Sequence, residues 1–313
     1  MKNDWYRRLR TVLLAGVLLS SLFTASCNFT WNQPNEDTPT ILPIYVLSVN
    51  DLHGYIMRDK EGRNGLSNMA YLINQIRDAD DYDNVILIGN GDMFQGTYIS
   101  NETNGLAVID AMNAMKFDAM GIGNHEFDWG IDVILKYFDG DPNNGEANFP
   151  LLNANIYVKA SNSLLTVKDG KVFESYIVER EGIKIGLISY IGDLYNSIIY
   201  SMVKDYEFDL NLSDSIERIG RSLKQAGADI IVVNIHYGDE YNKIFAQAKD
   251  EQGNYLVDAV INGHEHKRVQ DVVERDGGIP MPYVQAGSNG KYIGKITLYF
   301  NTKTRSVIDY DVE

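Results

Sequence analysis

The segment Ala-Met-Gly-Ile-Gly-Asn-His-Glu-Phe-Asp at residues 119–128 decides which fold we expect. Its first four residues are small or apolar and predict a short buried strand, which Gly123 ends. The polar residues Asn124, His125 and Asp128 follow directly. In open α/β sheets, ligands bind just beyond the carboxyl ends of the strands. This segment therefore predicts a functional site at the edge of a sheet.

Four further apolar runs end in the same kind of residue. Residues 44–49 run into Asn50-Asp51-Leu52-His53-Gly54, residues 85–88 into Gly89-Asn90-Gly91-Asp92, residues 230–235 into His236, and residues 257–261 into Asn262-Gly263-His264-Glu265-His266. Each segment alone is more typical of a turn or of a hydrogen-bonded polar group than of a ligand. All five histidines of the chain, however, fall in this set. Together the five segments indicate one metal site.

The stretches between these segments predict helices and more strands. Apolar residues recur at helical spacing in residues 66–76, 106–115, 131–138 and 216–223, and Gly227 is placed to end the last of these helices. Residues 183–188 predict another buried strand, residues 293–300 and 306–312 two closing antiparallel strands, and residues 139–148 a surface loop. Because there is no repeat and no second linker, we expect residues 44–313 to form one α/β domain.

The composition limits the class of protein. With 44% hydrophobic and 23% charged residues, the chain of 313 residues has the balance of a globular protein, not of a disordered or fibrous one. Its formal charge of −15 argues against binding nucleic acid through a broad basic face. The single cysteine excludes an intrachain disulfide and a zinc site built from cysteines.

The N-terminus predicts an export signal. A basic start is followed by an apolar run at residues 11–23 that is short for a membrane span, then by small residues and Cys27. We expect residues 1–26 to be a lipoprotein-type signal peptide and Cys27 to carry the lipid anchor; the alternative is an ordinary signal peptide and a free Cys27. Residues 27–43 predict a flexible tether. We therefore expect an exported lipoprotein that is anchored to a membrane, in the bacterial periplasm or on the cell surface.

The candidate ligands restrict the metal. Imidazole, carboxylate and amide donors without thiolates suit Zn, Mn, Co, Fe or Ni and suit Ca poorly. There are enough donors for two divalent ions, and a carboxylate between two cations about 3.5–4 Å apart can bridge them. Such pairs perform in-line displacement at phosphorus, in which a metal-held hydroxide attacks while both ions neutralise charge on the phosphoryl oxygens. We therefore expect two divalent metal ions as cofactors.

These five segments, in this order, resemble the signature of the calcineurin-like metallophosphoesterases. The longer string Gly-Asn-His-Glu-Phe-Asp, with Asn50-Asp51 before His53 and the late segment from Gln285-Ala286-Gly287 to Gly294, resembles the 5′-nucleotidase/UDP-sugar hydrolase branch. The resemblance implies an α/β sandwich of two mixed β-sheets flanked by helices, in the order α/β/β/α. It also implies a metal-dependent phosphoric ester hydrolase.

The resemblance assigns a role to each candidate residue. It implies that Asp51, His53 and His266 hold one ion, that Asn124, His236 and His264 hold the other, and that Asp92 bridges the two. It places His125 beside the phosphate, where it stabilises the transition state or protonates the leaving oxygen, with Asp128 to orient it. Glu126 and Glu265 stay open between a supporting role and simple solvation. Gly54 and Gly91 are expected to allow close backbone approach.

The same branch typically has a second, C-terminal domain that binds the nucleoside, and this chain ends at Glu313, where the metal domain would end. We therefore expect the catalytic half only. Three outcomes stay open: this half acts alone on phosphate mono- or diesters, it pairs with a separately encoded C-terminal domain, or it has lost activity. The leading expectation is an exported hydrolase of nucleotides or similar small phosphate esters. The alternatives are a cyclic-nucleotide or sugar-nucleotide phosphodiesterase and a surface binding protein with structural metals.

Overall fold

The computed structural model describes residues 40–313, apart from residue 59 and residues 61–64 and 80–82. The described residues fall in one compact unit. The expected signal peptide, the anchor at Cys27 and most of the expected tether lie outside the described residues. Among the residues described, no helix is both long and apolar enough to span a membrane.

The first of two large sheets has seven strands, in the order β16-β15-β1-β2-β3-β4-β7. The five strands from β1 to β7 are parallel, whereas β15 is antiparallel to β1 and β16 to β15. Their bounds are β1 Ile41–Val49, β2 Val85–Asn90, β3 Ala119–Gly121, β4 Leu151–Leu152, β7 Val172–Phe173, β15 Gly294–Asn301 and β16 Ser306–Val312.

The second sheet has six strands, in the order β13-β14-β12-β11-β9-β8. Its four central strands are parallel, and its edge strands β13 and β8 are antiparallel to their neighbours. The bounds are β8 Ser175–Arg180, β9 Ile183–Ile191, β11 Ile230–His236, β12 Ala259–Asn262, β13 Arg268–Val273 and β14 Met281–Ala286. A separate small sheet contains β5 Ile156–Val158, β6 Ser163–Leu164 and β10 Tyr206–Phe208.

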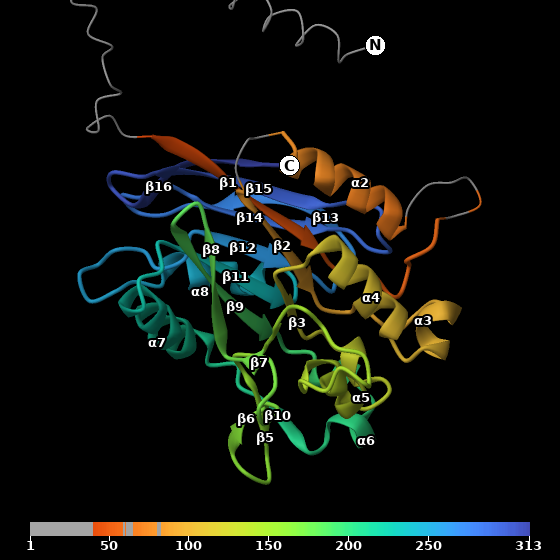
Figure 1. Cartoon of the computed structure of the whole chain (residues 1–313). Helices are drawn as coiled ribbons and strands as arrows, with labels where there is room; N and C mark the ends of the chain where they lie inside the picture. The colour runs from red at the N-terminus through yellow and green to blue at the C-terminus, as the bar shows by residue number, and fades with distance from the viewer. Residues whose placement is uncertain (1–39, 59, 61–64, 80–82) are drawn as a thin grey trace, which may run out of the picture. The chain divides into compact units, whose positions relative to one another are not determined.

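The two large sheets pack face to face through β-branched and other apolar side chains. Ile86 and Ile88 of the first sheet and Ile185 and Val232 of the second belong to this inner core. Because side chains alternate along a strand, the other face of each sheet is also apolar and is covered by helices. The first sheet packs against α2 Leu66–Arg77, α4 Leu106–Met115 and α5 Ile131–Leu135, and the second against α7 Leu212–Gln225 and α8 Asn242–Gln247 (Figure 1). The expected α/β/β/α sandwich is confirmed.

Short helices and single 3₁₀ turns make up the remaining helical segments of the described chain. These are α3 Tyr98–Glu102, α6 Tyr200–Val203 and the 3₁₀ turns His125–Phe127, Lys136–Phe138, Tyr195–Ser197 and Asp239–Tyr241. The helix expected at residues 131–138 is thus α5 followed by a 3₁₀ turn. Gly227 does follow α7, with a φ of 91° that glycine adopts readily.

Two strands that contain a proline differ from the sequence expectation. β1 begins at Ile41, not at residue 44, and includes Pro43. At that point β1 pairs only with β15, since β2 begins opposite Tyr45, so the missing N–H of Pro43 breaks no ladder. β14, which contains Pro282, was not expected from the sequence. Pro282 pairs with β13 alone, and the pairing with β12 starts at Tyr283.

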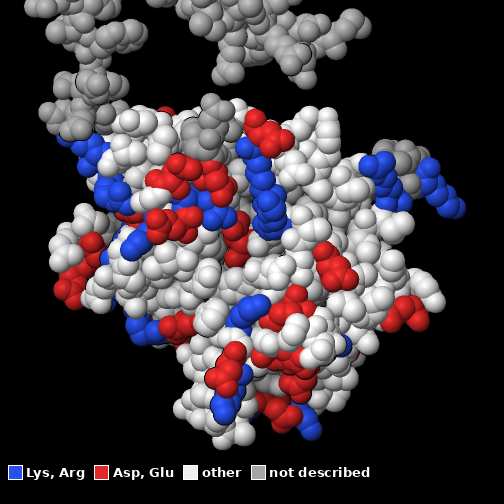
Figure 2. Space-filling model, in the orientation of Figure 1, with Lys and Arg blue, Asp and Glu red and all other residues white. Residues whose placement is uncertain are grey.

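The charged surface agrees with the composition. Figure 2 shows acidic and basic side chains interspersed with uncharged surface on the visible face, without a broad basic area. The net charge of −15 gives no support to a nucleic-acid partner.

Candidate metal centre

The two sheets bring the five predicted segments to one end of the sandwich. The segments that follow β1, β2 and β3 come from the first sheet, and His236 and the segment after β12 come from the second. Six of the predicted ligands form two groups of three. Within each group, the candidate ligand atoms lie within 4.8 Å of one another. One group is Asp51, His53 and His266, and the other is Asp92, His236 and His264.

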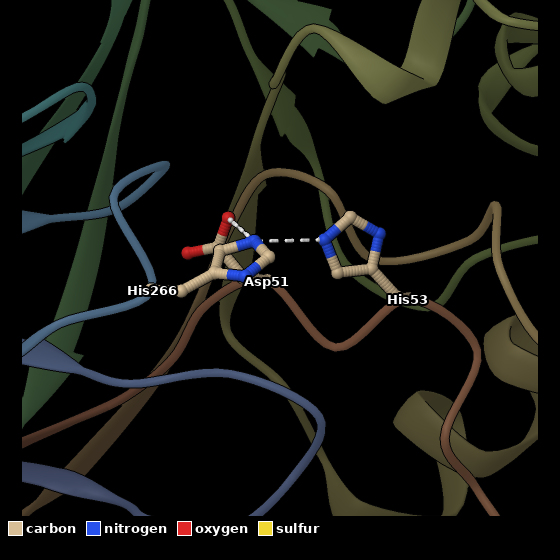
Figure 3. A group of neighbouring side chains, drawn as sticks. All are labelled: Asp51, His53 and His266. Atoms are coloured by element: carbon tan, nitrogen blue, oxygen red, sulfur yellow. Dashed lines mark hydrogen bonds and ion pairs between the residues drawn. The ribbon is translucent and has the colours of Figure 1, made fainter.

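The first group lies at the surface. Nε2 of His53 is 3.1 Å from Nε2 of His266, and the latter atom is 3.4 Å from Oδ1 of Asp51 (Figure 3). Nδ1 of His53 lies 3.0 Å from the carbonyl oxygen of Gln95, which directs Nε2 toward the group. Asp51 is fully buried, whereas the side chain of His266 is 46% exposed. Two ring nitrogens and a carboxylate oxygen therefore converge on one point that is open to solvent.

The second group is deeper. Nε2 of His236 lies 3.1 Å from Oδ2 of Asp92, and both side chains are buried. Nδ1 of His236 donates to the carbonyl of Asn90 at 2.7 Å, which leaves Nε2 as the atom that faces the group. Burial opposes the charged forms, but the mutual attraction of the two groups outweighs it. It raises the pKa of His236 to about 10 and holds the pKa of Asp92 well below its usual range.

A cation fits this arrangement. Nε2 of His236 is buried and, apart from its charged contact with Asp92, has no hydrogen-bond partner, so a bound metal would give this polar atom a further partner. The donors are imidazole, carboxylate and amide groups, with no thiolate among them. This donor set suits Zn, Mn, Co or Fe, in agreement with the sequence expectation.

The other predicted residues lie beside these groups. Oδ1 of Asn124 is 3.0 Å from Nδ1 of His264. Nδ1 of His125 is 2.8 Å from Oδ2 of Asp128, and the His125 ring lies 5.1 Å from the ring of His53 between centroids. The hydrogen bond that His125 donates to Asp128 raises the pKa of His125 to about 9, against the effect of partial burial. All nine predicted site residues are therefore gathered at one place.

The backbone of the centre is strained in a way that suits a functional site. Five of the site residues have a φ between 50° and 72°, a backbone region that residues other than glycine rarely adopt. They are Asp51, His53, Asp92, His264 and His266. Gly91 allows the close approach that was expected of it. A Cβ on Gly91 would lie 2.6 Å from both the amide nitrogen of Gly123 and Nδ1 of His236.

The structure shows the contacts of the two glutamates, Glu126 and Glu265, whose roles the sequence left open. Glu126 is fully buried, and its carboxylate accepts hydrogen bonds from the backbone N–H groups of Asp92, Met93 and Gly123 at 2.7–2.9 Å. Burial and the nearby charge of Asp92 raise its pKa to about 7. Glu126 thus ties the loop after β2 to the end of β3. Glu265 instead forms an ion pair with the exposed Lys267.

Sequence reasoning gave no role to Asn50, although it is part of one quoted segment. Its Oδ1 accepts from the N–H of Ala286 at 2.7 Å, and its Nδ2 donates to the carbonyl of Gly287 at 2.7 Å. The N–H of Asn289 in turn donates to the carbonyl of Asp51. The late segment therefore supports the segment that follows β1. Only the position of Asn50 beside Asp51 hinted at this.

A sandwich of this kind, with imidazoles and carboxylates gathered at one edge from both sheets, is the architecture of a metal-dependent hydrolase. Residues 44–268 match the family model "Calcineurin-like phosphoesterase", and the chain belongs to this family. It is a metal-dependent phosphoester hydrolase.

The chain is also similar to individual proteins. It is 29% identical over 335 residues to a 5′-nucleotidase of Vibrio parahaemolyticus, covering 97% of this chain and 56% of that protein. It is 29% identical over 295 residues to the trifunctional nucleotide phosphoesterase protein YfkN of Bacillus subtilis, covering 81% of this chain and 19% of that protein. The chain thus spans about half the length, or less, of these curated relatives.

Solved structures have the same fold. The calcineurin-like phosphoesterase YfkN from Bacillus subtilis superposes with a TM-score of 0.68 at 23% identity, covering 88% of this chain and 90% of that chain. A 5′-nucleotidase precursor from Thermus thermophilus superposes with a TM-score of 0.68 at 22% identity, covering 87% of this chain and 54% of that chain.

Proposed function

We propose that this protein is a 5′-nucleotidase-like enzyme that hydrolyses phosphate esters of nucleotides at a dinuclear metal centre. The observation that carries the proposal is the convergence of two ligand groups from facing sheets beside the His125–Asp128 pair. Relatives described as 5′-nucleotidases, which align with up to 97% of the chain, support nucleotides as the substrate class.

In this proposal each group holds one divalent ion. Asp51, His53 and His266 bind one ion, and His236, His264 and Asn124 bind the other. The family resemblance makes Asp92 the bridging ligand, and its buried carboxylate accepts a hydrogen bond from the backbone N–H of His125, which holds it in place. When bound, the two ions supply positive charge that polarises the phosphoryl group and activates water.

The side chains around the ions would do the rest. Asp128 holds Nδ1 of His125, so Nε2 of His125 is the atom available to the substrate. A protonated His125 beside the phosphoryl group stabilises the developing negative charge and donates a proton to the leaving oxygen. Glu126 and Asn50 keep the surrounding loops in place, as their hydrogen bonds indicate.

A phosphodiesterase is the second candidate. The similarity to a trifunctional nucleotide phosphoesterase favours activity on more than one class of nucleotide ester. As a partner we also propose a separately encoded C-terminal domain that supplies nucleoside contacts.

The test is a substrate panel on the chain from residue 27 onward, loaded with Mn or Zn. Phosphate release from 5′-AMP and p-nitrophenyl phosphate, and its loss after EDTA, is the expected result. Hydrolysis of a cyclic nucleotide or UDP-sugar but not of 5′-AMP would favour the diesterase. A metal-loaded protein that is silent on the whole panel would contradict the proposal.

We further propose that the protein is exported and lipid-anchored. Residues 1–26 are the signal peptide, Cys27 carries the lipid, the residues between Cys27 and β1 form the tether, and the catalytic domain begins with β1 at Ile41. Because Cys27 is the chain's single cysteine, palmitate labelling should disappear entirely in Cys27→Ser, which should also leave the membrane fraction. Labelling that persists in this variant would contradict the anchor.

A further inference from the structure

Asn90 is the last residue of β2 in the first sheet, and its side chain forms hydrogen bonds with the second sheet. It is fully buried. Its side-chain Nδ2 donates to the carbonyls of Ile235 and Ile261, each at 3.1 Å. Those two residues lie on the neighbouring strands β11 and β12 of the second sheet, whereas Asn90 belongs to the first.

The acceptors of Asn90 are placed close to the candidate ligands. Ile235 directly precedes His236, and Ile261 lies three residues before His264. Asn90 itself lies two residues before Asp92, and its own carbonyl accepts from Nδ1 of His236. One residue therefore contacts the backbone of both ligand-bearing strands of the second sheet and fixes the tautomer of the deepest histidine.

Apart from the polar contacts of Asn50 and Arg180, the contacts between the inner faces of the sheets do not fix the position along the strands so well. The inner faces pack through aliphatic side chains, and such packing has little directional preference. Metal ligands, in contrast, have to be placed to within about 0.2 Å. A hydrogen bond from the second sheet to the first joins the same strands, since Nδ2 of Asn234 on β11 donates to the carbonyl of Gly89 on β2 at 3.3 Å.

We propose that Asn90 is a positioning residue, which locks the two sheets in register at the metal edge and so sets the spacing between ligands of the first sheet and those of the second. The inference rests on the proposed metal centre. It concerns a side chain whose hydrogen bonds go to two backbone carbonyls and to which the sequence gave no role.

The experiment compares metal binding by Asn90→Ala and Asn84→Ala in the otherwise complete protein. Asn84 is the matched control, because it is also a fully buried asparagine, it directly precedes the same strand at its other end, and its Nδ2 donates to the carbonyl of Pro43. Binding of Co²⁺ and Mn²⁺ is measured by calorimetry, together with the visible spectrum of the Co²⁺ form.

We expect Asn90→Ala to bind metal about 10–100-fold more weakly, with an altered Co²⁺ spectrum, as is typical when a group that orients a ligand is lost. Asn84→Ala should lose stability but keep the affinity and spectrum of the unmodified protein. Equal metal affinity in Asn90→Ala and the unmodified protein, or equal losses in both variants, would overturn the proposal.

Asn90→Ser keeps a short donor and serves if Asn90→Ala does not fold. We expect its affinity to fall as well, because a serine hydroxyl cannot reach two carbonyls at once; unchanged affinity would again overturn the proposal. Failure of the proposed function is distinguishable, since an unmodified protein that binds two ions yet hydrolyses no ester refutes that function and leaves the role of Asn90 intact.

Discussion

His125 and Asp128 lie one turn apart and are joined by a hydrogen bond of 2.8 Å, and the side chain of His125 is 37% exposed. An imidazole so held and open to the substrate suits proton transfer and not metal binding. We expect His125→Ala to keep both ions and to lose about 10²–10⁴-fold in kcat. Metal content by mass spectrometry and turnover of p-nitrophenyl phosphate check this. Loss of an ion in His125→Ala would show that its role is misassigned.

Asp92 occupies a different position, since it is buried and lies against His236. If Asp92 bridges the ions, its removal affects both sites and leaves His236 without its carboxylate. We expect Asp92→Ala to lose both ions together, measured as metal per protein after dialysis. An Asp92→Ala protein that retains two ions would rule out the bridge.

At the scale of the element, the turn between β2 and the Asp92 loop depends on a glycine. Gly91 has a φ of 70°, and a Cβ there would collide with Gly123 and His236. Gly182 is the matched control, because its φ is 71° and a Cβ there would meet no atom within 4 Å. Gly182→Ala should cost about 1 kcal/mol of unfolding free energy from backbone strain alone.

Gly91→Ala should cost clearly more than Gly182→Ala and should also weaken metal binding, because the collision moves the Asp92 loop. Denaturant unfolding and metal titration of both variants check this. Equal effects in the two variants would mean that the close approach at Gly91 carries no weight.

Away from the candidate metal centre, an ion pair also joins the two sheets. Arg180 of β8 binds the carboxylate of Asp118, next to β3, and the two side chains are 18% and 12% exposed. Asp118 also accepts from the N–H of Leu87, which holds its carboxylate in place when Arg180 is removed. We expect Arg180→Ala to cost about 3 kcal/mol of unfolding free energy.

The control for Arg180 is Arg218→Ala, which breaks an ion pair with Glu174 in which the side chains are 56% and 35% exposed. This loss should be below about 1 kcal/mol, because water screens the pair. Chemical denaturation of both variants measures the difference. A similar cost in both would contradict the importance of burial.

At the scale of the whole molecule, metal release should have two phases. The ligands of one proposed ion include His266, 46% exposed, whereas His236 and Asp92 of the other are buried. Access of a chelator is therefore easier at the first ion. We expect EDTA to remove about one Co²⁺ quickly and the second slowly, followed by absorbance. His266→Ala should abolish the fast phase, and a single phase in the unmodified protein would refute the difference.

Local patterns were sufficient to predict much of the fold. Apolar runs and helical spacing predicted β1, β2, β9, β11 and the helices α2, α4 and α7, because burial of a face leaves a periodic trace in the residues that form it. Short strands such as β4 and β7 were missed, since two residues carry no period. β14 was also missed.

The sequence by itself determined which side chains to expect together, and all nine predicted site residues lie at one end of the sandwich. Only the tertiary structure decided which strands belong to which sheet, and with it that Glu126 is buried among backbone N–H groups and that Asn90 joins the two sheets. The physical reason is range. Periodicity and turn chemistry act between residues near in sequence, whereas a buried hydrogen bond depends on partners such as Ile235 and Ile261, which lie 145 and 171 positions from Asn90.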